Sequence, residues 1–183
     1  MTQPTDNLES IVLGGGCFWC LEAVYQQVRG IEVVTSGYAG GTVPNPTYEQ
    51  IETARTGHAQ VVKLDFRPDV ITFADILDVF WVVHNPTTLQ RQDYDVGPQY
   101  RSIILYLDEA QKRTAEESRN SAQKLWPNPI VTEIVPLEHF YKAESYHQNY
   151  FRNHPEQAYC QIIINPKLKK LRDKFQTRLA SDQ

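Results

Sequence analysis

The sequence predicts one domain of mixed α and β structure. Segments with strand composition alternate with segments that have the apolar spacing of amphipathic helices. A chain of 183 residues is long enough for one sizeable core and short for two. Neither an internal repeat nor a low-complexity stretch interrupts the pattern. We therefore expect residues 10–183 to form a single catalytic domain, and residues 1–9 to be a loosely attached or disordered tail.

The strand and helix signals cover most of the chain. Strand composition marks residues 11–13, 31–36, 57–66, 100–107 and 131–135, and helical spacing marks residues 20–28, 72–84, 108–124 and 166–179. Residues 161–164, directly after Cys160, also resemble a fixed strand. Two long loops occupy residues 37–48 and 86–99. Connections of that length are often functional, and a plain surface connection is the alternative.

Composition and charge limit the possible classes of function. The net charge of -4 argues against a general nucleic-acid-binding protein, because phosphate contacts need a basic face. The chain has no apolar run of about 18 residues and residues 1–10 are polar, so we expect neither a membrane segment nor a signal peptide. The cytoplasm is the expected compartment. Three cysteines are too few and odd in number for a disulfide scaffold, which fits thiols that are kept reduced.

The stretch Gly-Gly-Gly-Cys-Phe-Trp-Cys at residues 14–20 is the strongest chemical signal. It joins an apolar strand to a helix through three glycines, which indicates a tight turn or a close approach of the backbone. Cys17 would then lie in the first turn of the helix, where the N–H groups and the dipole should lower its thiol pKa. A lone cysteine is more often inert core. The glycines and the Cys-x-x-Cys spacing to Cys20 favour a reactive thiol here.

Several short motifs in this order resemble those of the A-type peptide methionine sulfoxide reductases. The resemblance extends from about Ile11 to Cys160 with natural spacing. The segments that carry it are Gly16–Cys20, Gly37–Gly41, Asn45–Tyr48, Thr56–Ala59, Phe80–Trp81, Asp95–Arg101 and Tyr146–Gln148. One such motif would be modest support, and seven in register are strong support.

The resemblance implies an enzyme that reduces the S epimer of methionine sulfoxide, free or in proteins, to methionine and thereby repairs oxidised proteins. Cys17 would attack the sulfoxide sulfur and end as a sulfenic acid, which a second thiol converts into a disulfide. A dithiol partner, in this family usually thioredoxin, would reduce that disulfide, and dithiothreitol could replace it in vitro. We expect no bound cofactor and no metal. The partners would be methionine sulfoxide and thioredoxin, with no nucleic acid and no membrane, and we expect a monomer.

The implied fold is α+β, a two-layer α/β sandwich with a mixed sheet. It would have the ferredoxin-like core of the family, long catalytic loops and an extended C-terminal segment. Phe18 and Trp19 match the apolar pocket for the methyl group of the substrate. Tyr48 and Tyr100 match the hydroxyls that bind the sulfoxide oxygen, and Asp95 matches a carboxylate that helps to organise the site.

One departure from the family pattern concerns the proton that the oxygen must receive. Negative charge develops on a sulfoxide oxygen as it leaves, so the site must supply donors or a proton. Gln60 occupies the place of the glutamate that the family uses for this purpose. An amide can donate a hydrogen bond but has no proton of suitable pKa to transfer. We expect Tyr48, Tyr100 or a bound water to deliver the proton, or the activity to be reduced.

The resolving thiol is either Cys20 or Cys160. Cys20 lies three residues beyond Cys17 on the same side of the predicted helix, so a local disulfide is geometrically plausible. Cys160 lies where many family members carry a resolving cysteine.

Two other classes of protein fit part of the pattern. A general thiol–disulfide oxidoreductase would share the nucleophile but has no use for Tyr48, Asp95 and Tyr100. A zinc-binding interaction module could use the three cysteines and a histidine, but it lacks a second closely spaced pair of ligands.

Overall fold

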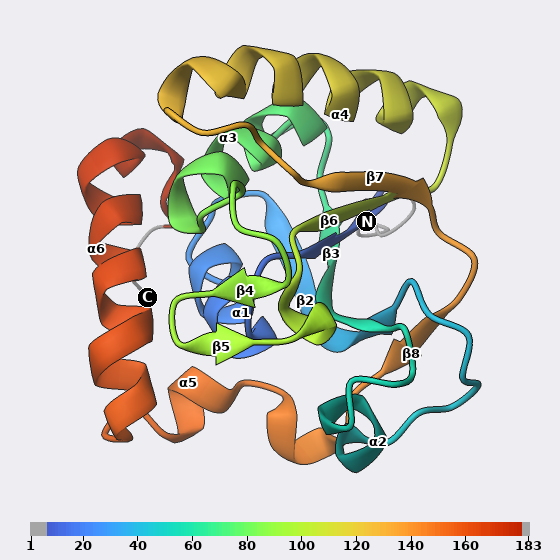
Figure 1. Cartoon of the computed structure of the whole chain (residues 1–183). Helices are drawn as coiled ribbons and strands as arrows, with labels where there is room; N and C mark the ends of the chain where they lie inside the picture. The colour runs from blue at the N-terminus through green and yellow to red at the C-terminus, as the bar shows by residue number, and fades with distance from the viewer. Residues whose placement is uncertain (1–6, 181–183) are drawn as a thin grey trace.

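The computed structural model of the chain describes residues 7–180 and contains a mixed six-stranded sheet. The strand order is β7-β6-β1-β3-β2-β8, in which β6 and β7 are parallel and every other neighbouring pair is antiparallel (Figure 1). The strands are β1 (Glu9–Gly14), β2 (Ile31–Ala39), β3 (Ala59–Phe66), β6 (Ile103–Tyr106), β7 (Glu133–Pro136) and β8 (Phe140–Lys142). The two central strands, β1 and β3, pair from Glu9 opposite Phe66 to Leu13 opposite Val62.

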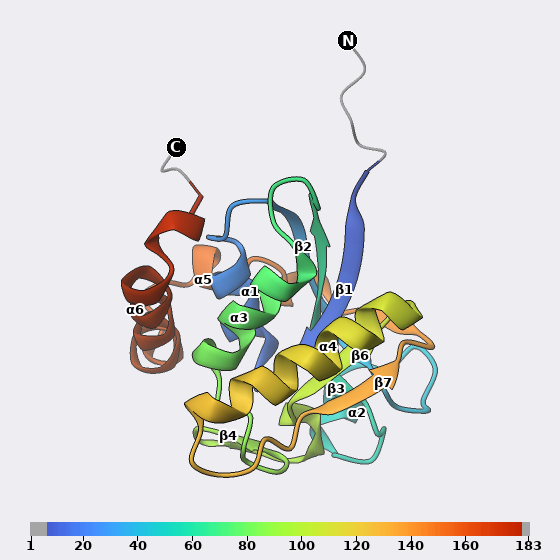
Figure 2. The same cartoon turned by 90° about the horizontal axis from the view of Figure 1, so that it is seen from above.

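Four longer helices cover one face of this sheet. They are α1 (Phe18–Tyr25), α3 (Phe73–Val83), α4 (Glu109–Ala122) and α6 (Asn165–Lys174), and residues from all four belong to one buried cluster with the sheet. Two short helices, α2 (Tyr48–Glu52) and α5 (Tyr150–Asn153), belong to the connections. Figure 2 shows the helical layer beside the sheet. This arrangement confirms the predicted α+β fold with two layers and a mixed sheet.

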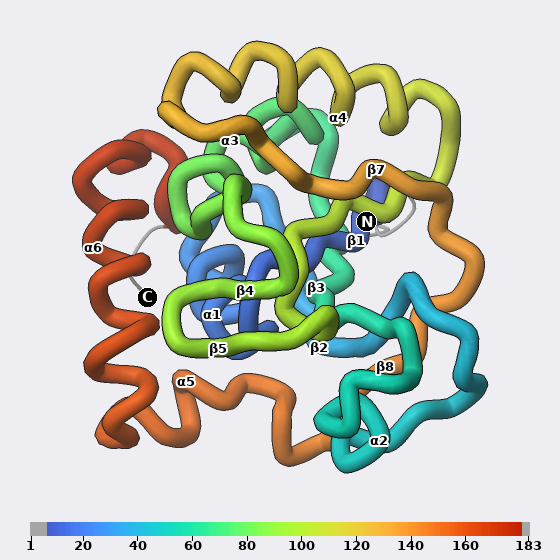
Figure 3. Tube along the Cα trace, in the orientation of Figure 1, coloured from blue at the N-terminus to red at the C-terminus, as the bar shows by residue number. Residues whose placement is uncertain are grey.

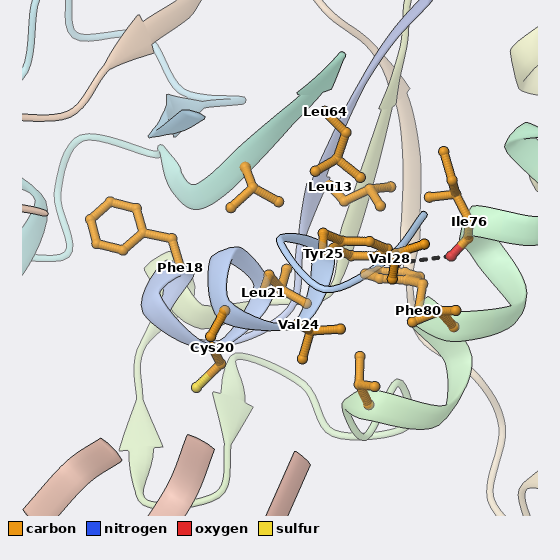
Figure 4. Close-up of a cluster of buried hydrophobic side chains, with 14 of the residues drawn as sticks. Leu13, Phe18, Cys20, Leu21, Val24, Tyr25, Val28, Leu64, Ile76 and Phe80 are labelled. Atoms are coloured by element: carbon orange, nitrogen blue, oxygen red, sulfur yellow. Dashed lines mark hydrogen bonds between the residues drawn. The ribbon is translucent and has the colours of Figure 1, made fainter. Parts of the chain in front are cut away.

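The core between sheet and helices is apolar and closely packed. Leu13, Leu21 and Val24 are at most 1% exposed, and Figure 4 shows them with Tyr25 and Ile76 in the same cluster. The Tyr25 hydroxyl donates a hydrogen bond of 2.9 Å to the Ile76 carbonyl, so the one polar atom of that ring is satisfied inside the core. Burial of such side chains contributes about 1.5–3 kcal/mol each, which holds α1 against β1.

The opposite face of the sheet carries a smaller apolar cluster. Val12, Val61 and Ile103 are fully buried there, and the chain around Leu137 and Phe140 covers them. Strand β1 is therefore buried on both faces, which explains why its sequence is an apolar run without alternation.

Helix α3 begins as the sequence predicts. Thr72 is its N-cap, and the Thr72 and Asp75 side chains each accept from the backbone N–H of the other, at 3.1 Å. This capping box satisfies two N–H groups that the helix itself leaves free. The Asp75 carboxylate also pairs with Arg178 at 2.6 Å, which ties the end of the described chain to α3.

The segment after Cys160 is helical, so the expectation of a strand there was wrong. Residues Cys160–Ile164 form a π-helical turn that continues into α6. The buried apolar side chains are Cys160, Ile164, Leu168 and Leu171, spaced by three or four residues, whereas Ile162 is 64% exposed. That spacing is typical of one helix face, and the run of isoleucines in between had obscured it.

The two long loops contain more structure than the sequence predicts. Strand β2 continues to Ala39, and a small hairpin of β4 (Arg91–Gln92) and β5 (Asp95–Val96) lies within the second loop. Of the expected tail, residues 1–6 lie outside the described residues, and Glu9 already belongs to β1. Among the helices of residues 7–180, none combines the length and the apolar character needed to cross a bilayer.

Candidate active site

A glycine corner between β1 and α1 sets the position of Cys17. A Cβ atom on Gly14 would lie 2.8 Å from the Ile103 side chain, so only glycine lets these two strands approach. Gly16 has a φ of +90°, which favours glycine, and its N–H donates to the Tyr100 carbonyl at 3.2 Å. The chain turns at once into α1, with Cys17 as its N-cap residue. The predicted strand, tight turn and helix are confirmed.

Cys17 is buried, and this reverses the predicted direction of its pKa. Its exposed fraction is 8%, and burial raises the thiol pKa well above its ordinary value. The nearby Cys20 raises the pKa further, the N–H of Trp19 lowers it, and the carboxylate of Asp95 adds to the increase. The expectation of a lowered pKa was wrong, because loss of hydration outweighs the N–H groups of the helix end. Burial therefore favours the protonated thiol over the thiolate.

Aromatic rings line one side of Cys17. The next residue, Phe18, is fully buried, and its ring centroid lies 5.0 Å from that of His147. Trp19 is half-buried and stacks on Tyr150 with 3.6 Å between centroids and 4° between planes. The Trp19 Nε1–H donates to His147 Nδ1 at 3.1 Å. These rings form an apolar wall that suits a methyl group.

His147 was quoted in a motif, but the sequence assigned no role to it. Its Nδ1 accepts from Trp19, so Nε2 carries the proton if the ring is neutral. Nε2 is buried and has no hydrogen-bond partner among residues 7–180. Burial lowers the pKa of His147, which favours the neutral ring. The side chain therefore orients Trp19 and leaves one N–H available beside the wall.

The segment that carries these rings is fixed by buried polar groups. The Glu22 carboxylate of α1 accepts from the N–H groups of Asn149 at 2.9 Å and Tyr150 at 3.0 Å. Gln148 accepts from the N–H of Ser36 at 3.0 Å and donates to its carbonyl at 2.9 Å. Contacts between residues more than 100 positions apart thus bring the predicted Tyr146–Gln148 motif to Cys17.

Two tyrosines, Tyr48 and Tyr100, also lie near Cys17, and the Tyr48 ring centroid is 4.5 Å from that of His147. Tyr48 is the first residue of α2, and its N–H donates to Glu144 at 3.0 Å. Tyr100 ends the short helix Pro98–Tyr100, and its hydroxyl donates to Glu52 at 3.3 Å. Burial and the charge of Glu52 raise the pKa of both tyrosines, and Cys17 also contributes to both increases. Both hydroxyls therefore remain protonated near the thiol.

Asp95 and Tyr159 complete the surroundings of the thiols. The Tyr159 hydroxyl donates to Asp95 at 2.8 Å and lies 3.5 Å from the sulfur of Cys20. It also lies within hydrogen-bonding range of Cys17 and lowers its pKa. Burial raises the pKa of Asp95, which is partly offset by Tyr159. Sequence reasoning missed Tyr159, although it lies directly before Cys160. Figure 3 shows α5 beside α1.

Gln60 lies in β3 and is 1% exposed. Its side-chain oxygen accepts from the N–H of Phe18 at 3.2 Å, so the amide binds one of the free N–H groups at the start of α1. The structure thus places Gln60 beside Cys17, as predicted, and gives its oxygen a structural partner.

The other two cysteines lie in different elements, Cys20 in α1 and Cys160 at the start of the π-helical turn that leads to α6. All three thiols are free and buried. Burial raises the pKa of Cys20 to about 11, partly offset by Lys167 and Tyr159. Figure 4 shows the Cys20 side chain pointing away from Leu13 and Leu64. Cys20 contributes to the raised pKa of Cys17, and Cys160 and Cys17 both contribute to the raised pKa of Tyr150. Residues 7–180 contain no group of three or more histidines, cysteines and carboxylates placed to hold a metal ion.

Comparisons with known proteins agree with this geometry. A sequence model of the family described as "Peptide methionine sulfoxide reductase" matches residues 9–179. The chain is 50% identical over 186 residues to "Peptide methionine sulfoxide reductase MsrA" of Polynucleobacter asymbioticus, with 98% of each chain covered.

Two solved structures of Mxr1 from Saccharomyces cerevisiae have the same fold. The reduced form matches with a TM-score of 0.81 and 32% identity, over 87% of this chain and 92% of that chain. Mxr1 in complex with Trx2 matches with a TM-score of 0.58 and 26% identity, over 82% and 89%. Because the family match and the similarity to a relative at 50% identity both extend over almost the whole length, the chain belongs to the peptide methionine sulfoxide reductase family of oxidoreductases.

Proposed function

We propose that Cys17 is the nucleophile with which this protein reduces the S epimer of methionine sulfoxide, free and in proteins. One observation carries the proposal: Cys17 begins α1 directly before the aromatic rings of Phe18 and Trp19, and the tyrosines Tyr48 and Tyr100 lie near its thiol. The wall suits the methyl group of the substrate, and the hydroxyls suit its oxygen. A sulfoxide sulfur with three different substituents is chiral, so this arrangement accepts one epimer.

The reaction transfers one oxygen atom. The Cys17 sulfur attacks the sulfoxide sulfur and loses its proton, the sulfoxide S–O bond breaks, and the oxygen, after taking up a proton, becomes bonded to Cys17 as a sulfenic acid. Cys17 is oxidised by two electrons and the sulfoxide is reduced to methionine. Trp19, backed by Phe18, would contact the methyl group, and Tyr48 and Tyr100 would donate to the oxygen. Asp95 would act by fixing Tyr159 beside the thiols.

Cys20 is the resolving thiol in this proposal. Cys17 and Cys20 occupy the N-cap and N3 positions of α1. Thr72 and Asp75 have the same spacing at the start of α3, and each side chain there accepts a hydrogen bond from the backbone N–H of the other residue. Side chains at the N-cap and N3 positions therefore lie on the same side of a helix start. A Cys-x-x-Cys pair at a helix start is a recurrent redox arrangement. Cys160 instead is fully buried in the helical segment that leads to α6.

A thioredoxin is the proposed reductant. Mxr1, a relative of similar fold, has been solved in complex with Trx2. The disulfide would be reduced by thiol–disulfide exchange with such a dithiol protein, and dithiothreitol would serve in vitro. The cytoplasm suits this cycle because its thiols are kept reduced.

The decisive assay supplies the separated S and R epimers with dithiothreitol to the wild-type chain and to Cys17→Ser. We expect the wild type to reduce the S epimer alone and Cys17→Ser to reduce neither. Turnover by Cys17→Ser would contradict the assignment of the nucleophile.

The resolving thiol is tested with thioredoxin as reductant. Cys20→Ser should release about one methionine per enzyme and then stop. Cys160→Ser should continue to turn over and serves as the matched control. The opposite pattern would assign the role to Cys160.

A further inference from the structure

The thiol that closes the disulfide must lose a proton in surroundings that disfavour a thiolate. Cys20 is 2% exposed, and burial raises its pKa to about 11, so little of it is a thiolate at neutral pH. The thiolate, not the thiol, is the nucleophile that attacks another sulfur. A base within reach of the Cys20 sulfur would therefore accelerate the second half of the cycle.

Two hydrogen bonds lead from the Cys20 sulfur to a carboxylate. The Tyr159 hydroxyl lies 3.5 Å from that sulfur and donates to Asp95 Oδ2 at 2.8 Å. A hydroxyl has one hydrogen atom, and Tyr159 uses it toward the carboxylate, so the thiol is the donor in the contact between sulfur and hydroxyl. The hydrogen atoms thus point in one direction, from Cys20 to Tyr159 and from Tyr159 to Asp95.

Three separate elements hold the members of this chain in place. Asp95 belongs to β5 of the small hairpin. Tyr159 directly precedes the π-helical turn, and its ring packs edge-on against Trp19 with 5.7 Å between centroids. Cys20 lies in the first turn of α1, where its N–H donates to the Cys17 carbonyl at 3.1 Å. The contacts therefore exist only where the hairpin, the later segment and α1 meet.

Two further charged groups face this path. Lys167 of α6 and Asp93 of the hairpin turn pair at 3.2 Å, and they have opposite effects on the pKa of Asp95. They also have opposite effects on the pKa of Cys20. Burial is the largest influence on Asp95 and raises its pKa, and the hydrogen bond from Tyr159 offsets part of that increase. A carboxylate with a raised pKa is a stronger base than an ordinary one.

We propose that Tyr159 and Asp95 remove the thiol proton of Cys20 when the Cys17 sulfenic acid is converted into the disulfide. The inference rests on the proposed function. The Cys20 proton passes to the Tyr159 oxygen as the Tyr159 proton passes to Asp95, so the tyrosine stays neutral. Tyr159 contacts the reacting sulfur, and Asp95 acts through it.

The atoms and electrons of this step balance. The Cys20 sulfur bonds to the Cys17 sulfur, the S–O bond of Cys17 breaks, and the oxygen leaves as water. Cys20 is formally oxidised by one electron and Cys17 is reduced by one. The water contains one proton more than the sulfenic hydroxyl, which equals the proton that Asp95 releases when it returns to the carboxylate.

A single turnover of the reduced full-length chain with the S epimer, followed from pH 6 to 9 without a reductant, tests the proposal. Methionine release reports the first step, and the loss of two thiols reports disulfide formation. Trapping with dimedone and mass spectrometry measures the sulfenic acid between the two steps. The ratio of the two rates is compared, so that a change in methionine release alone does not affect the result.

Tyr159→Phe removes the hydroxyl, and Asp95→Asn keeps an oxygen for the hydrogen bond but cannot take the proton. In both variants, disulfide formation should lag behind methionine release at least about tenfold more than in the wild type at pH 7, and the sulfenic acid should accumulate. This lag should shorten about tenfold for each pH unit, because Cys20 then ionises directly, below its pKa of about 11. Tyr94→Phe is the matched control, since Tyr94 directly precedes Asp95 and is 84% exposed, and its timing should be that of the wild type.

The outcomes separate this inference from the function on which it rests. Disulfide formation with wild-type timing in Tyr159→Phe or in Asp95→Asn would overturn it. A lag of the same length at every pH would indicate a purely structural role and would overturn it as well. In either case, methionine release by the wild type and none by Cys17→Ser would leave the proposed function intact. A wild type that releases no methionine would instead contradict the proposed function.

Discussion

The Gly14–Cys20 corner positions Cys17 through its backbone, whereas the Tyr146–Cys160 segment surrounds Cys17 through side chains. In the corner, Gly16 adopts a left-handed φ and bonds to Tyr100 through its N–H. In the later segment, Tyr150 stacks on Trp19 and Tyr159 bonds to Asp95.

The difference lies in how far along the chain the contacts reach. The corner depends on a strand and a helix that are adjacent in the sequence, so local conformation determines most of it. The later segment reaches Cys17 through the buried Glu22 and through Gln148, across more than 100 residues. We therefore expect changes in the corner to affect chemistry and stability together, and changes in the later segment to affect substrate binding more than stability.

The largest effect is expected for Gly16→Ala. A Cβ atom there would lie 2.6 Å from Gln92 at a φ of +90°, so the free energy of unfolding should fall by about 2 kcal/mol. A shift of Cys17 by about 1 Å should also lower kcat/KM by up to about a hundredfold. Gly30→Ala is the matched control, because Gly30 has a φ of +94° and its Cβ would meet Ile71 at 2.7 Å, away from the site.

Urea unfolding and kcat/KM would be measured for both variants under conditions where each is folded. Equal losses of stability, with a loss of activity in Gly16→Ala alone, are expected. Full activity in Gly16→Ala would show that the backbone of the corner does not position the thiol.

A smaller but clear effect is expected in the alkylation of Cys17 by iodoacetamide. Because burial raises the pKa of Cys17, the thiolate fraction of Cys17 at pH 7 is below that of an ordinary thiol. Iodoacetamide should therefore alkylate Cys17 more than about tenfold more slowly than it alkylates glutathione. The rate should keep increasing above pH 9. Mass spectrometry would identify the alkylated residue. In the urea-unfolded chain, the alkylation rate of Cys17 should depend on pH with the midpoint of an ordinary thiol. A plateau below pH 8 in the folded protein would contradict the raised pKa.

The smallest effect is expected for Tyr150→Ala. Loss of the stack on Trp19 should raise the KM for methionine sulfoxide about fivefold, equivalent to about 1 kcal/mol, with kcat nearly unchanged. Tyr150→Phe keeps the ring and should behave as the wild type. A reduction in kcat instead of an increase in KM would mean that the later segment acts on the chemical step, as the corner does.

Much of the fold could be predicted because its signals are local. The capping box of Thr72 and Asp75 and the apolar spacing after it identified α3, and the glycines before Cys17 identified the turn. The segment after Cys160 was misassigned, because three consecutive isoleucines suggest a strand, while the buried positions Cys160 and Ile164 follow a helical period. Only packing against α1 and α3 decided between the two.

The sequence by itself was enough to predict Cys17 as the nucleophile, to place it at a helix start and to identify the motifs around it. These features depend on residue type and on neighbours a few positions away. Only the tertiary structure decided the pKa of Cys17, since its direction depends on how completely other elements exclude water from the thiol. It also decided which carboxyl group contacts the tyrosines, since Glu52 and Tyr100 are 48 positions apart and meet only when α2 packs beside the Pro98–Tyr100 turn. Short-range geometry can be read from the chain, but hydration and long-range contacts exist only in the folded protein.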